Sequence, residues 1–234
     1  MTTVSGQYYN AFLAGCRTLY EPDVKVEPIL PKTISYPPAP ASRVGTAYLF
    51  ELLKKVSEQS GEGDFTIKLS QIVSLTDYYG AKFGQAILYA ANWRQALTIE
   101  RRYQPLSQEF ARINMIENKH TVKIFWECGF ANPENGICGM ELVIANHIRF
   151  AQWVSWDGNI PVRSISFRHA DPGNGGIFGQ HYSCEVLFNQ DHDAIELDKN
   201  IIDMPLPQAD PQMLATMCAR LDKALASHYN AGPT

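Results

Sequence analysis

This 234-residue sequence lacks an excess of basic residues. It carries 20 lysines and arginines against 24 aspartates and glutamates, which gives a formal net charge of -4 at pH 7. Proteins that bind DNA or RNA strongly neutralise many phosphates with clustered basic side chains. The composition therefore argues against strong nucleic-acid binding by this chain on its own.

Long apolar runs and paired cysteines are also missing. No stretch approaches the roughly 18 apolar residues that span a membrane, and the opening residues MTTVSGQYYNAFLAGC lack the features of a signal peptide. The five cysteines are odd in number and none belongs to a C-x-x-C pair, so neither a disulfide framework nor a zinc site is indicated. We expect a cytoplasmic protein with buried thiols and no membrane partner.

Motifs for catalysis are equally scarce. There is no G-x-S-x-G motif, and no pair of carboxylates on one face is evident. The stretch DPGNGGIFG has Phe178 where a phosphate-binding G-x-G-x-x-G loop needs its last glycine, and no amphipathic helix is evident after it, so we expect a turn-rich connection. His181 and Cys184, with His192 nearby, form only half of a metal-binding motif. The sequence thus predicts no catalytic residue, no metal and no cofactor, and an enzyme that uses His169 or His181 is the less favoured alternative.

The pattern of apolar residues predicts the secondary structure. Hydrophobic residues make up 45% of the chain and charged residues 19%, which is typical of a globular domain. Helical spacing predicts helices over residues 48–56, ending near Gly61, and over residues 82–103, 140–156 and 213–225. Alternation predicts a hairpin over residues 111–126 and a strand over residues 162–167 with Arg163, Ile165 and Phe167 on one face. Shorter apolar runs follow over residues 185–188 and 194–197. Residues 65–73 fit either a strand or a helix. The fold class predicted is α+β: mixed helices with a small antiparallel or mixed sheet in a single compact body.

Two proline-rich stretches divide the chain. Four prolines lie between residues 31 and 40, where they form an irregular arm that is either a linker or packed along the body. We therefore expect an N-terminal segment and arm over residues 1–44 and a domain over residues 45–234. Near the end, Pro205 and Pro207 hold the chain extended, Asp210 is placed to cap a helix, and Pro211 suits its first turn. That helix is expected to dock on the body through its apolar residues Met213, Met217, Leu221 and Leu225.

Aromatic and polar residues on these elements indicate a pocket for a small ligand. Aromatic walls with a few polar groups are typical of such sites, and the candidates for binding are Arg94, Tyr103, Trp126, His147 and Trp153. Trp126 and Trp153 are equally consistent with packing in the core. A histidine on an apolar helical stripe, such as His147, is more often a core residue bonded to a neighbour.

The helix over residues 140–156 is apolar nearly all round. Such a helix is either central to the body or meets a second subunit. Its candidate residues for dimerisation are Met140, Ile144, Ile148 and Ala151.

Three stretches, in this order, resemble the effector-binding N-terminal domain of one branch of the AraC/XylS family of bacterial transcription regulators, the branch often labelled arabinose-binding. The first is KFGQAILYAANWRQALTIERRYQPL and the second is PVRSISFRHADP. The third is CEVLFNQDHDAIELDKNIIDMPLPQADPQML, which is similar to the close of that domain. The resemblance spans roughly residues 45–225, and the combination is more specific than any single stretch.

The resemblance implies a sensor domain. Regulators of this type bind a small effector in the N-terminal domain, often dimerise through it, and bind DNA through a C-terminal domain with two helix-turn-helix units. This chain stops at Thr234 without a basic recognition helix, so that DNA-binding domain is expected to be absent from it, either because the chain is a piece of a longer protein or because it stands alone. The motif residues are carried over as architectural ones: Phe83, Gly84, Tyr103, His169 and Pro205.

The favoured hypothesis is therefore the ligand-sensing and dimerising domain of an AraC-type regulator, not an enzyme. Its expected partners are a small-molecule effector, a second copy of the chain, and DNA only through the absent domain. The branch label does not identify the effector as a sugar. The alternative from another class is an oligomerisation module that is indifferent to ligands.

Overall fold

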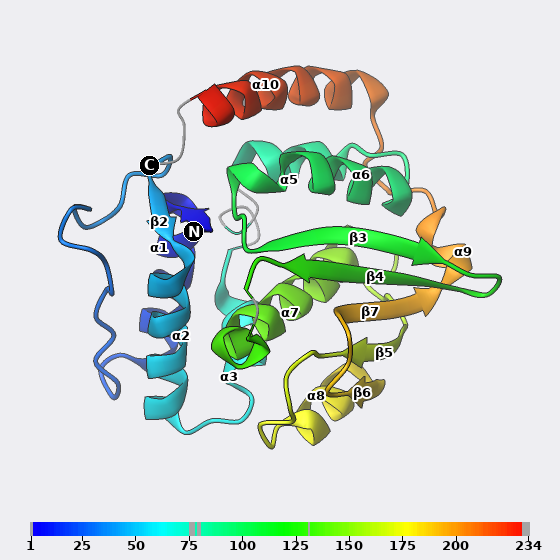
Figure 1. Ribbon diagram of the computed structural model, residues 1–234. Coiled ribbons are helices and arrows are strands. Elements are labelled where there is room, and N and C mark those ends of the chain that lie inside the picture. The colour runs from blue at the N-terminus through cyan, green and yellow to red at the C-terminus, as the bar shows by residue number, and fades with distance from the viewer. Residues whose placement is uncertain (1, 75–77, 79–80, 131, 231–234) are drawn as a thin grey trace.

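The computed structural model describes residues 2–74, 78, 81–130 and 132–230, which form helices around two small sheets (Figure 1). The helices are α1 (Gly6–Tyr20), α2 (Thr46–Ser60), α3 (Phe65–Ile72), α5 (Ala81–Leu88), α6 (Trp93–Tyr103), α7 (Ile137–Val154), α8 (Gly175–Tyr182), α9 (Lys199–Ile202) and α10 (Pro211–Asn230), with short 3-10 helices at Gln104–Leu106 and Pro133–Gly136. The strands are β1 (Thr3–Ser5), β2 (Arg43–Gly45), β3 (Ala111–Glu117), β4 (Thr121–Cys128), β5 (Val162–Ser166), β6 (Glu185–Leu187) and β7 (Asp193–Asp198). The predicted α+β class is confirmed.

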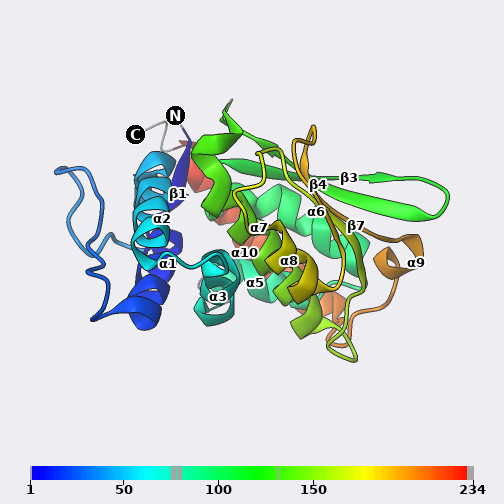
Figure 2. The same cartoon turned by 90° about the horizontal axis from the view of Figure 1, so that it is seen from below.

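The larger sheet has the strand order β3-β4-β7-β5-β6. Its pairs are antiparallel except for β5 and β6, which are parallel. In β4 and β7, Ile124 lies opposite Ile195 and Val122 lies opposite Leu197. Because side chains alternate along a strand, these apolar residues share one face of the sheet. Figure 2 shows α5, α6, α7 and α10 gathered on one side of the strands, so the core lies between this face and the helices.

The helix predicted over residues 82–103 is two helices, and the prediction of one continuous helix was wrong. α5 ends at Leu88 and α6 begins at Trp93, with Asn92 as its N-cap. The Asn92 side chain accepts a hydrogen bond from the Gln95 amide at 2.9 Å, and the Gln95 side chain accepts one from the Ala91 amide at 2.7 Å. These reciprocal bonds satisfy amides that a helix start would otherwise leave unpaired, which stabilises the interruption.

Two further expectations need correction. A helix, α8, begins within the glycine-rich stretch at Gly175, where the fully buried Phe178 packs against Phe167. In β5, Arg163 is exposed while Ile165 is buried, because the pairing with β7 shifts register between Val162 and Ser164. One residue of slip moves a side chain to the other face of a sheet.

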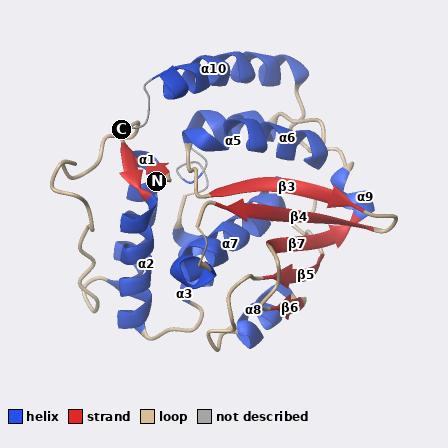
Figure 3. Cartoon of the chain, viewed as in Figure 1, coloured by secondary structure: helices blue, strands red, loops and turns tan. Residues whose placement is uncertain are grey.

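The open alternatives near the N-terminus are resolved by the structure. Residues 65–72 form the helix α3, not a strand. The proline arm runs beside α1: the Asn10 side-chain amide donates to the Pro38 carbonyl at 2.9 Å, and the Gly6 amide donates to the Ser42 carbonyl at 2.7 Å. Figure 3 shows the β1–β2 sheet beside α1 and α2. Side chains of α1 belong to the same hydrophobic core as the later helices, and the division of the chain at residue 44 stays a prediction.

The predicted C-terminal helix is confirmed as α10, and it lies along α5 (Figure 1). The Asp210 carboxylate accepts hydrogen bonds from the Gln212 and Met213 amides, both at 2.9 Å, which is the geometry of a helix cap. Met217 and Leu221 are buried against the body. The stiff segment before α10 is bonded to the interruption between α5 and α6, where the Leu206 amide donates to the Ala91 carbonyl at 3.1 Å.

Candidate functional site

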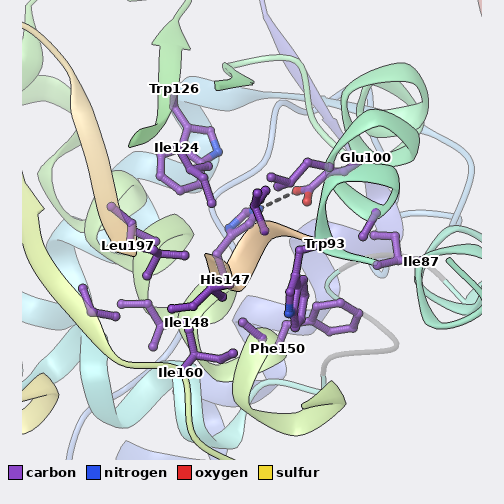
Figure 4. A pocket seen from close by; sticks show the side chains of 17 residues that line it. Ile87, Trp93, Glu100, Ile124, Trp126, His147, Ile148, Phe150, Ile160 and Leu197 are labelled. Carbon is purple, nitrogen blue, oxygen red and sulfur yellow. Dashed lines mark hydrogen bonds and ion pairs between the residues drawn. The ribbon is translucent and has the colours of Figure 1, made fainter. Parts of the chain in front are cut away.

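A small cavity lies between the sheet and the helices α6 and α7 (Figure 4). Its volume is about 60 Å³. The walls are almost wholly apolar and come from α5, α6, α7, α9, the three strands β4, β5 and β7, and the loop before β5. The residues that line it are Ile87, Trp93, Ala96, Leu97, Glu100, Ile124, Trp126, His147, Ile148, Phe150, Ala151, Ile160, Val162, Ile195, Leu197, Ile201 and Ile202.

Regular secondary structure places these side chains. On α7, His147, Ile148 and Ala151 recur at helical spacing and face the sheet. On β4, Ile124 and Trp126 are two residues apart, so they point to the same face. The cavity is thus a gap in the core between the sheet and the helices.

The polar centre of the cavity is a buried pair, Glu100 and His147. The His147 Nε2 lies 2.5 Å from Glu100 Oε1, and its Nδ1 lies 2.6 Å from the Val143 carbonyl oxygen, to which it donates. Burial lowers the pKa of His147, but the negative charge and hydrogen bond of Glu100, together with the Val143 carbonyl, outweigh burial and raise the pKa above its usual value. Glu100 therefore favours the protonated form of His147, and the two side chains satisfy each other within the cavity.

Trp126 brings an unused hydrogen-bond donor to the same place. Its side chain is fully buried, and its Nε1 has no hydrogen-bond partner among the residues that the structure describes. The indole packs edge to face against His147 with a centroid distance of 4.8 Å. Figure 4 shows the indole nitrogen on the side of the ring that faces His147 and Glu100. A buried N–H without an acceptor costs about 1–3 kcal/mol, so an acceptor placed here would bind favourably.

The structure brings two of the five predicted ligand residues together and separates the other three. Trp126 and His147 line the cavity. Arg94 pairs with Glu117 and Asp203 outside it. The roles of all five residues in ligand binding stay predictions.

The remaining two aromatic candidates lie elsewhere. The Tyr103 ring is buried, and its hydroxyl donates to Asp222 Oδ1 at 2.6 Å, so Tyr103 joins α6 to α10. Trp153 is 54% exposed and packs against Phe150 near the end of α7.

Glu100 and Trp93 were missed by the sequence analysis. Trp93, Leu97 and Glu100 recur at i, i+4 and i+7, so they share one helical face. A carboxylate that continues an apolar stripe is the signal that marks Glu100, because a buried charge requires a partner.

The four predicted dimerisation residues contact their own chain. Met140, Ile144 and Ile148 are buried in the core, and Ala151 lines the cavity. A dimer that used these side chains would require them to leave the core. Their role in pairing stays a prediction.

The histidines considered for catalysis or metal binding lie apart from the cavity. The His169 ring packs against Phe167 and Phe188, and its Nδ1 donates to the Ala170 carbonyl at 2.8 Å. His181 packs edge to face against Tyr182 near the end of α8. Within the described part of the chain, no group of three or more His, Cys, Asp or Glu side chains is arranged to hold a metal ion, and no helix is both long and apolar enough to span a membrane.

Comparison with known proteins gives three findings. A protein family described as "Arabinose-binding domain of AraC transcription regulator, N-term" matches residues 36–206. Every residue that lines the cavity falls within this range, whereas α10 lies beyond it. No curated protein sequence matches the chain.

A solved structure shares the fold. The crystal structure of the transcriptional regulator CdpR from Pseudomonas aeruginosa superimposes with a TM-score of 0.66 at 12% sequence identity, over 90% of this chain and 61% of that one. At this identity the likeness concerns the fold alone. The present chain spans about three fifths of the length of that protein.

Proposed function

This chain belongs to the family of N-terminal arabinose-binding domains of AraC transcription regulators, and from that premise we propose that it senses a small-molecule effector in the cavity between α6, α7 and the sheet. The observation that carries the proposal is the apolar cavity with an unused buried donor, Trp126 Nε1, inside the family-matched region. Concave, mostly apolar sites with a few placed polar groups are where proteins hold small ligands.

The proposed output is control of DNA binding in a bacterial cytoplasmic regulator. In this proposal a C-terminal helix-turn-helix domain contacts DNA, since the chain itself has a net charge of -4 and little means of neutralising phosphates. Occupancy of the cavity acts by favouring one conformation of the sensor domain over another. We assign no catalytic step to the chain.

The route from cavity to output is supported by the segment that follows the sheet. Ile201 and Ile202 of α9 form part of the cavity wall. Directly after them, the Leu206 amide donates to the Ala91 carbonyl and the Asp210 amide donates to the Tyr89 carbonyl, both at 3.1 Å. Asp210 then caps α10. A ligand that displaces α9 would therefore act on the start of α10 through a few residues of stiff chain.

A homodimer is part of the same proposal, because helix-turn-helix regulators commonly bind two half-sites as dimers. Sedimentation velocity at several protein concentrations tests it. A strict monomer with and without effector would remove this part of the proposal. A dimer that is unaffected by every ligand tried would favour an oligomerisation module instead.

A thermal-shift screen tests effector sensing. A compound at about 100 times its Kd adds about 2.7 kcal/mol to the free energy of unfolding, which for a chain of this length raises the melting temperature by roughly 5 °C. Hydrogen exchange then locates the site, because amides of residues 199–210 should gain protection when the cavity is occupied. The proposal fails if no compound raises the melting temperature, or if the effect survives when the cavity is filled by mutation.

A further inference from the structure

We propose that the occupant of the cavity is a small, neutral, largely apolar molecule with one hydrogen-bond acceptor, which Trp126 Nε1 binds, and not a sugar or a carboxylate. This inference rests on the proposed function and specifies the chemistry of its ligand. Three features found together support it: the unused donor of Trp126, the hydrogen-bonded pair of Glu100 and His147, and the apolar walls.

The Trp126 N–H determines which polar group the ligand needs. The indole N–H can donate but cannot accept. Trp126 is fully buried and water does not reach this N–H, so a ligand acceptor meets it only by displacing part of the cavity wall. A carbonyl, ether or hydroxyl oxygen of a ligand would satisfy it without leaving another buried group unpaired.

The charges at the cavity exclude an anionic group. Glu100 and His147 are the only titratable residues among those that line it, and they are bonded to each other. A ligand carboxylate would lie beside the Glu100 carboxyl group and compete with it for His147, with no other basic residue in the cavity lining. Arg94 of α6 is held outside the cavity by Glu117 and Asp203.

A sugar is disfavoured by the lack of polar partners. An aldopentose carries several hydroxyl groups, and each needs a donor or acceptor once it leaves water. Of the three polar residues at the cavity, Glu100 and His147 already bond each other, and Trp126 offers a single donor. Each hydroxyl left unpaired lowers the affinity by about tenfold.

The size of the cavity selects compact ligands. Its volume of about 60 Å³ is less than half of the roughly 150 Å³ of an engineered apolar cavity that binds benzene. A one-ring ligand therefore has to displace part of the wall. Trp93 is only partly buried, and α9 is a single turn of helix, so we expect the wall to move at these two places.

The test compares four probes of similar size that differ in charge and in hydrogen-bonding groups. The probes are acetophenone, which is neutral with one acceptor; ethylbenzene, which has no acceptor; benzoate, which is anionic; and L-arabinose. Binding to the full chain is followed by the indole N–H resonances in ¹⁵N NMR spectra, of which the four tryptophans give four. The Trp126 resonance is assigned by its loss in Trp126→Phe. We expect acetophenone to bind and to shift the Trp126 resonance strongly, ethylbenzene to bind more weakly, and benzoate and arabinose to leave the spectrum unchanged.

Two variants separate the hydrogen bond from general packing. Trp126→Phe keeps an aromatic ring but removes the donor, so it should weaken acetophenone by about three- to tenfold while changing ethylbenzene by less than twofold. Trp153→Phe is the matched control, since Trp153 is exposed and lies outside the cavity lining, and it should change neither affinity. If Trp126→Phe does not fold, the comparison of acetophenone with ethylbenzene in the unmutated chain still decides the question.

The outcomes distinguish this inference from the proposed function. Binding of arabinose or benzoate in the cavity, with the Trp126 resonance shifted, would overturn the ligand class and leave the sensor proposal intact. Equal affinities for acetophenone and ethylbenzene would overturn the role of the Trp126 donor. Failure of acetophenone to bind would likewise overturn this inference, and failure of every compound in the wider thermal screen would overturn the sensor as well.

Discussion

Filling the cavity by mutation should stabilise the protein and abolish its response to ligand. Ala151 lies on α7 and lines the cavity, so Ala151→Leu places three further carbon atoms inside it. Empty core volume costs about 24 cal/mol per Å³, and about 60 Å³ therefore corresponds to about 1.4 kcal/mol. A few tenths are lost because leucine is a slightly weaker helix former than alanine. We expect a gain of about 1 kcal/mol, or roughly 2–4 °C in melting temperature.

The assay pairs urea unfolding with the thermal-shift screen. Ala215→Leu is the matched control, because it makes the same substitution on the exposed face of α10. The control should change stability little and keep the full ligand response. The reasoning is refuted if Ala151→Leu lowers the melting temperature and still responds to ligand, since the cavity would then be neither open space nor the binding site.

Three further predictions concern the groups around the cavity and α10. Glu100→Gln removes the carboxylate that faces His147 and should cost about 1.5–3 kcal/mol by urea unfolding near pH 6. The pKa of His147 is raised in the folded protein. The stabilisation is therefore fully present below the unfolded pKa of about 6.5 and is lost as pH rises through the folded pKa. A difference in the free energy of unfolding between wild type and variant that grows with pH would contradict this prediction. Asp210→Ala removes the cap of α10 and should cost about 1 kcal/mol, seen as faster hydrogen exchange in the first turn, whereas Asp210→Asn should restore most of it. Leu221→Ala truncates a buried anchor of α10 and should destabilise by about 2–3 kcal/mol with faster proteolysis of that helix; unchanged proteolysis would show that other contacts hold α10 in place.

The parts of the fold that the sequence predicts well have a strong local pattern. The helices α2, α7 and α10 and the β3–β4 hairpin follow from apolar spacing alone. The interruption between α5 and α6 does not, because the apolar stripe continues through it from Ala86 to Leu97. The stop depends partly on the cap at Asn92, a local signal, and partly on hydrogen bonds from residues 206 and 210, which no local pattern shows. Tertiary contacts also decide α8, whose first turn contains two glycines that disfavour a helix.

The candidate site could be predicted only in part for a related reason. Trp126 and His147 could be predicted from the sequence. Trp126 follows the alternation of apolar residues on a strand, and His147 lies on an apolar helical stripe. Arg94 follows Trp93 directly, and adjacent helical residues diverge by about 100°, so the cavity that receives Trp93 excludes Arg94. Which face of α6 meets the sheet is decided by tertiary packing. A residue's chemistry therefore indicated that it belonged to a pocket, but only packing showed which pocket.

The small size of the cavity bears on how strongly a ligand could act as a switch. A ligand shifts a conformational equilibrium only by the difference between its affinities for the two states. A cavity of about 60 Å³ admits no one-ring molecule without movement of its wall, so the closed state binds such a ligand hardly at all. The difference in binding free energy between the open and closed states is then nearly as large as the binding free energy of the open state. The free energy of moving the wall is subtracted from it. Since α9 forms part of that wall and leads within a few residues to the cap of α10, the same movement that admits the ligand is the one placed to change the position of α10.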